Sequence, residues 1–365
     1  MSAVIAEVDR PAVAAAGGVR YDALIAGLCL VFQAGAYLDV WAHAHRPELE
    51  TFFTPWHAVL YSGFFAVAVA TAAPLVLRRR APGAPWSAAL PAGYDLSAIG
   101  VLVFFLGGML DMLWHVVFGI EVGVEALLSP SHLVLAIGAT LLLTGPLRAA
   151  WRRHEASAPW PAVLSLAFLL SSLMFWTQYA HHLGRPWPAM DFRPVAAEFP
   201  LIAPDLLFRN AQPNQSIYMA HALGVASILL QAGLLAAVVL LAVRRWGPAL
   251  PAGAFTVVLG LAALMFGFAR DQLIQVPGAI VAGAVADVLL HRLKPSAARS
   301  AALRTFAFAV PFVYFALFFA TLALTGGVWW AVSLWSGSII LAGMIGWLLS
   351  WLVVPAAVSA LPGRH

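Results

Sequence analysis

The sequence predicts an all-α integral membrane protein whose transmembrane helices, about ten in number, form five hairpins with internal repeats. Its 365 residues are 62% hydrophobic and only 10% charged, and its mean hydropathy is +0.88, a composition typical of polytopic membrane proteins. Apolar runs long enough to cross a bilayer recur along the chain. Basic residues cluster after every second run, which indicates loops that alternate between the two sides of a membrane.

The order of the apolar runs gives the predicted helices and their topology. We predict transmembrane helices at residues 22–43, 56–77, 94–117, 131–150, 159–180, 216–243, 252–269, 274–291, 303–325 and 328–354. The basic clusters follow the even-numbered helices and are Arg78 to Arg80, Arg148 with Arg152 and Arg153, Arg244 with Arg245, and Arg292 with Lys294. Because cytoplasmic loops carry the excess of Lys and Arg, we expect both termini in the cytoplasm and the hairpin tips outside, in a multi-pass protein of the bacterial inner (plasma) membrane.

The chain divides into four segments that differ in polarity and histidine content. We assign residues 1–20 to a cytoplasmic tail, 21–154 to two similar hairpins, 155–250 to a third hairpin with a long outer loop at 183–215, and 251–365 to C-terminal hairpins. The single cysteine, Cys29, lies in an apolar run, so a disulfide or a thiolate metal cluster within one chain is excluded. The pI near 9.6 reflects the topology clusters, and we expect no nucleic-acid partner.

The outer ends of the first two hairpins carry nearly the same motif. It consists of Asp-x3-His at the end of one helix and Pro-x-His at the start of the next. An Asp and a His four residues apart lie on one face of a helix, so each copy brings a carboxylate and two imidazoles to one hairpin tip. This ligand set suits a metal ion. The predicted metal ligands are Asp39, His43 and His57 in the first copy, and Asp111, His115 and His132 in the second.

The third hairpin resembles a degenerate copy of the same motif. Gln178-x3-His182 keeps the four-residue spacing, and His221 opens the following helix. We therefore include His182 and His221 among the predicted metal ligands, as residues that complete one of the sites. The proline-rich outer loop at 183–215 is expected to form an ordered lid over the hairpin tips. In the fourth hairpin, Arg270 and Asp271 are interpreted as an ion pair near the outer surface.

Several metals and arrangements fit these ligands. Neutral imidazole and carboxylate together bind copper, zinc, iron or manganese. The six residues of the two good copies form either one crowded site or two three-ligand sites, and three protein ligands with an open position are typical of a reactive centre. Methionines at the same level favour Cu(I); these are Met109, Met112, Met174 and Met219. Alternatively, each Asp and His form only a hydrogen-bonded pair, and duplication of an ancestral hairpin preserves the pattern.

The motif resembles the metal site of the membrane-bound copper monooxygenases, which oxidise methane, short alkanes or ammonia. The membrane C-type subunit of that family carries Asp-x3-His-x12-His. The first copy here is Asp39-x3-His43-x13-His57, whereas the second, Asp111-x3-His115-x16-His132, has a longer spacer. The resemblance covers about thirty residues per copy, and the duplication departs from the family's pattern. It implies a copper site facing the outer side. The string Asp-x2-Trp-His-x2-Phe-Gly at 111–119 is also similar to uncharacterised bacterial membrane proteins.

Three functions follow from these observations. The first is a membrane metalloprotein with an Asp/His site at the extracytoplasmic face, with copper favoured and zinc or iron as alternatives. As an enzyme it would be an oxidase or monooxygenase of apolar substrates that arrive through the lipid bilayer, with an external electron donor or partner subunits. The second is a metal transporter or metal-delivery protein, and the third is a non-catalytic structural subunit of a membrane complex. The sequence leaves the oligomeric state open.

Overall fold

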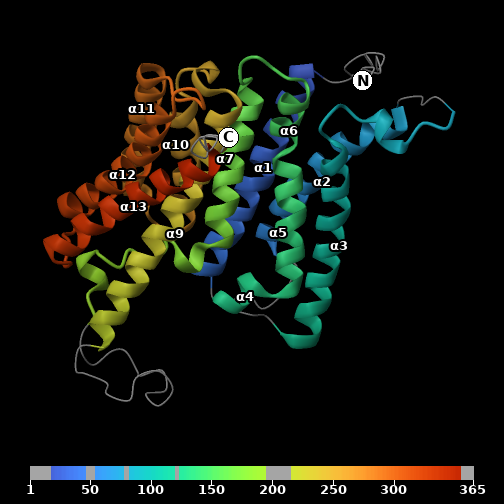
Figure 1. Ribbon diagram of the computed structural model, residues 1–365. Helices are drawn as coiled ribbons and strands as arrows, with labels where there is room; N and C mark the ends of the chain where they lie inside the picture. Colours follow the sequence, from blue (N-terminus) through green and yellow to red (C-terminus); the bar gives the residue numbers. More distant parts are fainter. Residues whose placement is uncertain (1–17, 47–53, 78–81, 120–122, 195–214, 355–365) are drawn as a thin grey trace, which may run out of the picture.

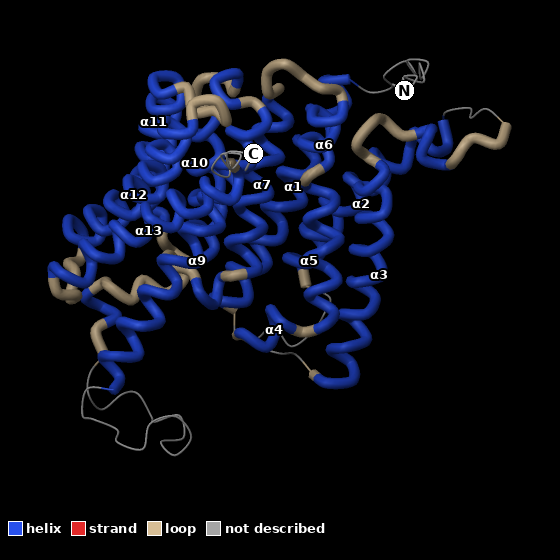
Figure 2. Tube along the Cα trace, in the orientation of Figure 1, coloured by secondary structure: helices blue, strands red, loops and turns tan. Residues whose placement is uncertain are grey.

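The computed structural model describes residues 18–46, 54–77, 82–119, 123–194 and 215–354, and its regular structure there is helical (Figure 1, Figure 2). The α-helices are α1 (Gly18–His45), α2 (Pro55–Leu77), α3 (Asp95–Phe118), α4 (Val124–Leu128), α5 (Pro130–Leu143), α6 (Gly145–Arg152), α7 (Trp160–Trp176), α9 (Gln215–Arg245), α10 (Ala254–Ala269), α11 (Val276–Leu293), α12 (Ser300–Thr325) and α13 (Val332–Val353). The short 3₁₀ helices are η1 (Trp86–Ala89), η2 (Gln178–Ala180), η3 (Met190–Phe192), η4 (Gly247–Ala249) and η5 (Leu273–Gln275).

Seven helices of the described part are long and apolar enough to cross a membrane: α1, α2, α3, α9, α11 with its preceding turn, α12 and α13. Helices α7 and α10 are apolar but have only 17 and 16 residues. An all-α chain with several helices of membrane-spanning length is therefore confirmed. The count of ten spans stays a prediction, as does the cytoplasmic location of the termini, because residues 1–17 and 355–365 lie outside the described ranges.

The fourth predicted helix, at 131–150, is two helices in the structure. Helices α5 and α6 meet at Thr144 and bend by 44°. Pro146 explains the break, because proline lacks a backbone N–H and its ring clashes with the carbonyl of the preceding turn. The pair together has the length and hydropathy of one span.

Four of the five predicted hairpins are pairs of packed helices: α1 with α2, α3 with α5, α10 with α11, and α12 with α13. The third prediction differs from the structure, because α7 packs mainly on α10 and α9 packs mainly on α13. Helix α7 is largely buried and lies in the middle of the bundle, where it also contacts α1 and α6 (Figure 1). The third hairpin is thus open, and its helices join the two halves of the bundle.

Glycines allow the helices of the first two hairpins to approach closely. A Cβ added at Gly35 or Gly63 would lie 2.8 or 2.7 Å from a backbone Cα of the partner helix. In the second hairpin, a Cβ at Gly138 would lie 2.5 Å from the backbone nitrogen of Phe104, and one at Gly107 would lie 3.1 Å from α5. Each pair holds the same position in its motif, four residues before the Asp and six residues after the second His. The two hairpins therefore make equivalent close contacts, as small residues permit in membrane helices.

An aromatic cluster joins the two hairpins to each other. The rings of Phe32 and Phe104 meet edge to face with centroids 5.0 Å apart, and Phe64 lies 4.7 Å from Phe104. These residues lie on α1, α2 and α3, and all three side chains are buried. Aromatic pairs of this geometry stabilise a core beyond the area they bury. The cluster fixes the two hairpin tips side by side.

Basic residues at the opposite end of the bundle are partly buried and paired. Arg153 forms an ion pair with Asp22, which is only 1% exposed. Arg148 donates to the carbonyl oxygens of Gly93 and Leu141 and to Ser97. Asp22 and Asp39 are 17 residues apart on α1, which corresponds to roughly 26 Å along the helix axis. This basic cluster therefore ties helices together at the end of the bundle remote from Asp39.

We predict that Gly138→Ala destabilises the protein, because the new methyl group meets the backbone of α3 and the helices must separate. Overpacking of this kind should lower the apparent melting temperature in detergent by roughly 3–6 °C. Gly27→Ala is the matched control, since no atom lies within 4 Å of a Cβ added there. Alanine at that helical position should leave stability unchanged or slightly raised. Equal melting of the two variants in differential scanning fluorimetry would contradict the tight crossing.

Candidate metal centre

The second histidine of each motif is positioned by a helix N-terminus. Pro55 and Pro130 occupy the first positions of α2 and α5, where the missing N–H costs nothing. The preceding hydroxyl caps each helix: Thr54 Oγ1 accepts from the backbone N–H of His57 at 3.1 Å, and Ser129 Oγ accepts from that of His132 at 3.5 Å. The string [Ser/Thr]-Pro-x-His thus places the histidine at the third position of its helix. There it faces the end of the preceding helix, which carries the Asp-x3-His.

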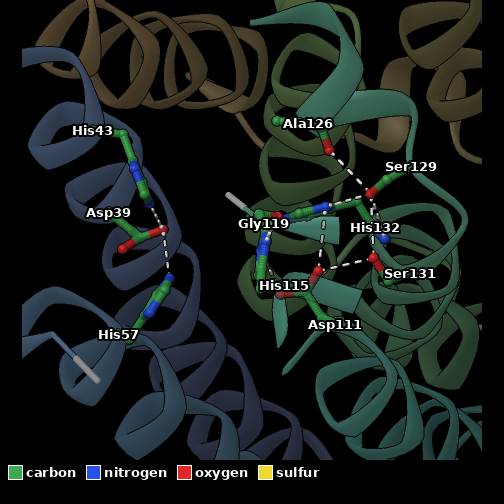
Figure 3. A network of polar contacts seen from close by, with 10 residues as sticks. All are labelled: Asp39, His43, His57, Asp111, His115, Gly119, Ala126, Ser129, Ser131 and His132. Atoms are coloured by element: carbon green, nitrogen blue, oxygen red, sulfur yellow. Dashed lines mark hydrogen bonds and ion pairs between the residues drawn. The ribbon is translucent and has the colours of Figure 1, made fainter. Parts of the chain in front are cut away.

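The first group contains Asp39, His43 and His57 (Figure 3). Asp39 Oδ2 lies 3.6 Å from His43 Nε2 and 3.4 Å from His57 Nε2. These distances exceed the usual 2.7–3.2 Å of a hydrogen bond. They match the roughly 3.4 Å between ligand atoms that a tetrahedral ion with bonds of about 2.1 Å requires. Asp39 Oδ1 is buried and has no hydrogen-bond partner among the described residues. The donor set could therefore hold a metal ion.

The second group contains Asp111, His115 and His132 and has similar Asp–His separations, made through both carboxylate oxygens. Asp111 Oδ2 lies 3.6 Å from His115 Nε2, and Asp111 Oδ1 lies 3.4 Å from His132 Nδ1. Ser131 donates to Asp111 Oδ1 at 2.9 Å and orients this carboxylate, whereas Ser129 Oγ lies 2.7 Å from His132 Nδ1 and occupies that ring nitrogen (Figure 3). Within each group, the three ligand atoms lie within 4.8 Å of one another. The structure thus brings six of the eight predicted ligands into two sets of three.

Both groups line a single cavity with a volume of about 330 Å³. Sequence reasoning left open whether the six residues form one site or two, and the structure gives two sets that share one space. Apolar side chains form much of the wall, and they are Phe32, Leu60, Phe104, Leu135, Ala139 and Phe175. The short helix α4, which the sequence analysis did not predict, adds Ala126 and Leu127 to the lining. An ion in either group would face a mostly apolar compartment.

Tyr61 and Arg270 are polar residues of the cavity wall that the sequence did not identify as site residues. Tyr61 lies one helical turn after His57, and this i, i+4 spacing was a signal that could have identified it. Arg270 also lines the cavity and donates to Gln178 Oε1. The predicted ion pair with Asp271 does not form, since Asp271 has φ of +56° and pairs with His45 at 2.8 Å. The left-handed turn sends the neighbouring side chains to different partners.

The structure places His182 and His221 outside both groups of ligands. Helix α7 ends at Trp176, so Gln178 and His182 do not share a helical face. The His182 ring is 2% exposed and packs against aromatic rings of α12, while His221 stacks on Trp329 with centroids 4.7 Å apart. Aromatic burial explains these histidines in the absence of the Pro-x-His string that positions His57 and His132.

The described part of the predicted lid, residues 183–194, lies against the turn between α12 and α13. Met190 N donates to Gly327 O at 3.2 Å, and Trp329 N donates to Pro188 O at 3.1 Å. No residue of this part lines the cavity. Residues 195–214 of the predicted lid lie outside the described ranges.

Comparison of the chain with protein-family models, with curated proteins and with solved structures found no match. The resemblance to copper monooxygenases therefore rests on the spacing of the motif alone.

We predict that Ser131→Ala weakens metal binding by the second group, because Asp111 loses the hydroxyl donor that orients it. Loss of such a partner typically costs 10–100-fold in affinity. The measurement is a competition titration with a chromophoric chelator, made in a His57→Ala background so that the second group is observed alone. Ser336→Ala is the control, since that hydroxyl donates to the backbone of its own helix. An affinity equal to that of the control would show that Ser131 does not support the site.

We predict that His182 contributes to acid sensitivity. Burial lowers its pKa to about 3, whereas an unfolded histidine titrates near ~6.5. Above pH ~6.5 His182 is neutral in both the folded and the unfolded protein, so its burial costs no protonation energy. As the pH falls toward the pKa in the folded protein, the unfolded state binds a proton that the folded state does not, and stability is lost. Between pH 7 and pH 5, the melting temperature of His182→Phe should fall by less than that of the wild type. The exposed His291→Phe variant should follow the wild type. Parallel slopes for all three proteins would refute this assignment.

Proposed function

We propose that this protein is a membrane metalloenzyme, an oxidase or monooxygenase in which two Asp/His centres serve one substrate cavity at the extracytoplasmic face. The observation that carries the proposal is that both sets of three ligands line the same cavity. Their equivalent positions in two hairpins support an internal repeat. Copper is the favoured metal, and zinc and iron are the alternatives.

The ligand number favours a reactive centre. Structural zinc sites close with four protein ligands, whereas catalytic sites keep a position open for substrate or water. Each group here offers three ligands and lines the cavity. Copper bound in this way would supply electron transfer to oxygen, and the substrate would be oxidised. The chain itself supplies the imidazoles and carboxylates that hold the metal, the Ser131 hydroxyl that orients Asp111, and an apolar wall that favours apolar substrates.

The shape of the cavity favours an enzyme over the other two functions. A transport path would need polar groups leading inward. Gln33 and Ser172 line the cavity but are hydrogen-bonded to each other, and Phe32, Phe64 and Phe104 pack together between the two hairpins. Side chains that only locked the hairpin tips would be expected at hydrogen-bond distance, whereas the Asp–His separations are 3.4–3.6 Å. Electrons would come from an external donor or from a partner subunit, and substrate would arrive through the lipid.

We predict two equivalents of copper in protein purified in mild detergent without chelators, measured by inductively coupled plasma mass spectrometry. His57→Ala and His132→Ala should each lose one equivalent, because each removes a ligand from a different group. His45→Ala is the matched control: it lies at the same end of the bundle and pairs with Asp271, outside both groups. It should keep both equivalents.

The same samples test the reaction. Copper-loaded wild type with a quinol reductant should consume oxygen faster when short alkanes are added, and each single variant should lose this increase. A wild type that stays metal-free after reconstitution with copper, zinc and iron would overturn the proposal. Zinc alone, lost from the same variants, would exclude the redox reaction.

A further inference from the structure

Arg270 places a positive charge in the wall of the cavity without a carboxylate to balance it. The residue follows the last turn of α10 and lines the same cavity as both ligand groups. Its hydrogen bond goes to a neutral acceptor, Gln178 Oε1, and its Nε is buried without a partner in the described part of the chain. No carboxylate of the described residues forms an ion pair with it. The half-buried guanidinium has five N–H donors, more than this one acceptor can satisfy.

Two other half-buried arginines of the bundle have partners that compensate their charge. Arg153 pairs with both Asp22 and Glu155. Arg148 has no carboxylate but donates to several oxygens, including two backbone carbonyls. Among the described residues, Arg270 has neither a carboxylate nor a backbone carbonyl as partner, because Asp271, next to it in the chain, pairs with His45 instead. Leaving a partly desolvated charge uncompensated is costly, so an Arg in this setting indicates a ligand that completes it.

A second guanidinium and an amide group lie near Arg270. Arg185 is close enough to add repulsion between the two guanidinium groups. Asp39 and Asp111 are each engaged with two imidazoles. Gln178 accepts from Arg270 through its oxygen and has an amide N–H₂ as a further donor. Guanidinium and amide donors side by side suit the planar, two-oxygen geometry of a carboxylate.

We propose that Arg270 and Gln178 bind the carboxylate of the substrate, an amphipathic monocarboxylate whose apolar tail lies along the Phe32, Phe104 and Leu135 wall near the two ligand groups. This inference rests on the proposed function for the role of the ligand as a substrate. It narrows the substrate class from apolar molecules in general to molecules with an anionic head and an apolar chain. The head would hold the tail at a fixed distance from the ligand groups, which is how a remote contact orients a reacting carbon.

The test uses octanoate as the probe and octanamide as its neutral analogue. The full-length protein is placed in nanodiscs of phosphatidylcholine, and binding of radiolabelled octanoate is measured by equilibrium dialysis, with empty nanodiscs subtracted. Arg270→Gln should weaken binding at least tenfold, because it removes the charge but keeps a polar side chain. Arg270→Lys should weaken it less. Arg193→Gln, an exposed arginine outside the cavity wall, should bind as the wild type does. Octanamide should compete poorly.

Metal content measured on the same samples separates this inference from the proposed function. Metal retained in Arg270→Gln, together with lost octanoate binding, supports both. Metal retained with octanoate binding unchanged, or with octanamide competing equally, overturns the carboxylate site and leaves the metalloenzyme standing. A metal-free wild type overturns the enzyme, and Arg270-dependent octanoate binding then supports an anion site without the reaction. The octanoate dialysis is repeated in nanodiscs that contain phosphatidylglycerol. Weaker octanoate binding there would show that an anionic lipid head group competes for the site.

Discussion

Direct backbone contact between two helices at glycine is the constraint on which each metal group depends. Gly35 and Gly63 bring α1 against α2, and Gly107 and Gly138 do the same for α3 and α5. Asp39 lies four residues beyond one crossing glycine and His57 six residues before the other, which is roughly 6 and 9 Å along the helix axes. Over so short a distance the helices have hardly diverged, so an imidazole of one reaches a carboxylate of the other. A larger side chain at the crossing would move the ligands apart.

The second requirement is that ionisable side chains near a membrane be satisfied. Isolated Asp and His residues at membrane depth are costly, and they are retained where they have partners or line a cavity. Here each carboxylate meets two imidazoles, and all six side chains line one cavity. The aromatic contact between Phe32 and Phe104 holds the two hairpins together beside this polar region. The same packing that closes the apolar core therefore creates the compartment that the ligands face.

The two groups are similar but not equivalent in their surroundings. Asp111 accepts a hydrogen bond from Ser131, whereas Trp56 occupies the corresponding position beside His57. The side chain of Asp111 is 6% exposed and that of Asp39 is 15% exposed. The second carboxylate is thus more rigidly oriented, while the first has an oxygen without a partner. Two groups that differ in this way would hold a metal with different strength while lining one cavity.

The sequence by itself determined the apolar, helical class and the six Asp and His side chains that could hold a metal. Both follow from local features: hydrophobic length, the four-residue spacing of Asp and His, and a capped Pro-x-His that opens a helix. Tertiary structure alone decided that the two ligand sets share a cavity, that Arg270 faces it, and that α7 and α9 separate to pack on α10 and α13. These outcomes depend on which distant helices pack together, and no spacing within a helix encodes that choice. His182 illustrates the difference, because its spacing copied the motif while burial among aromatic rings decided its place.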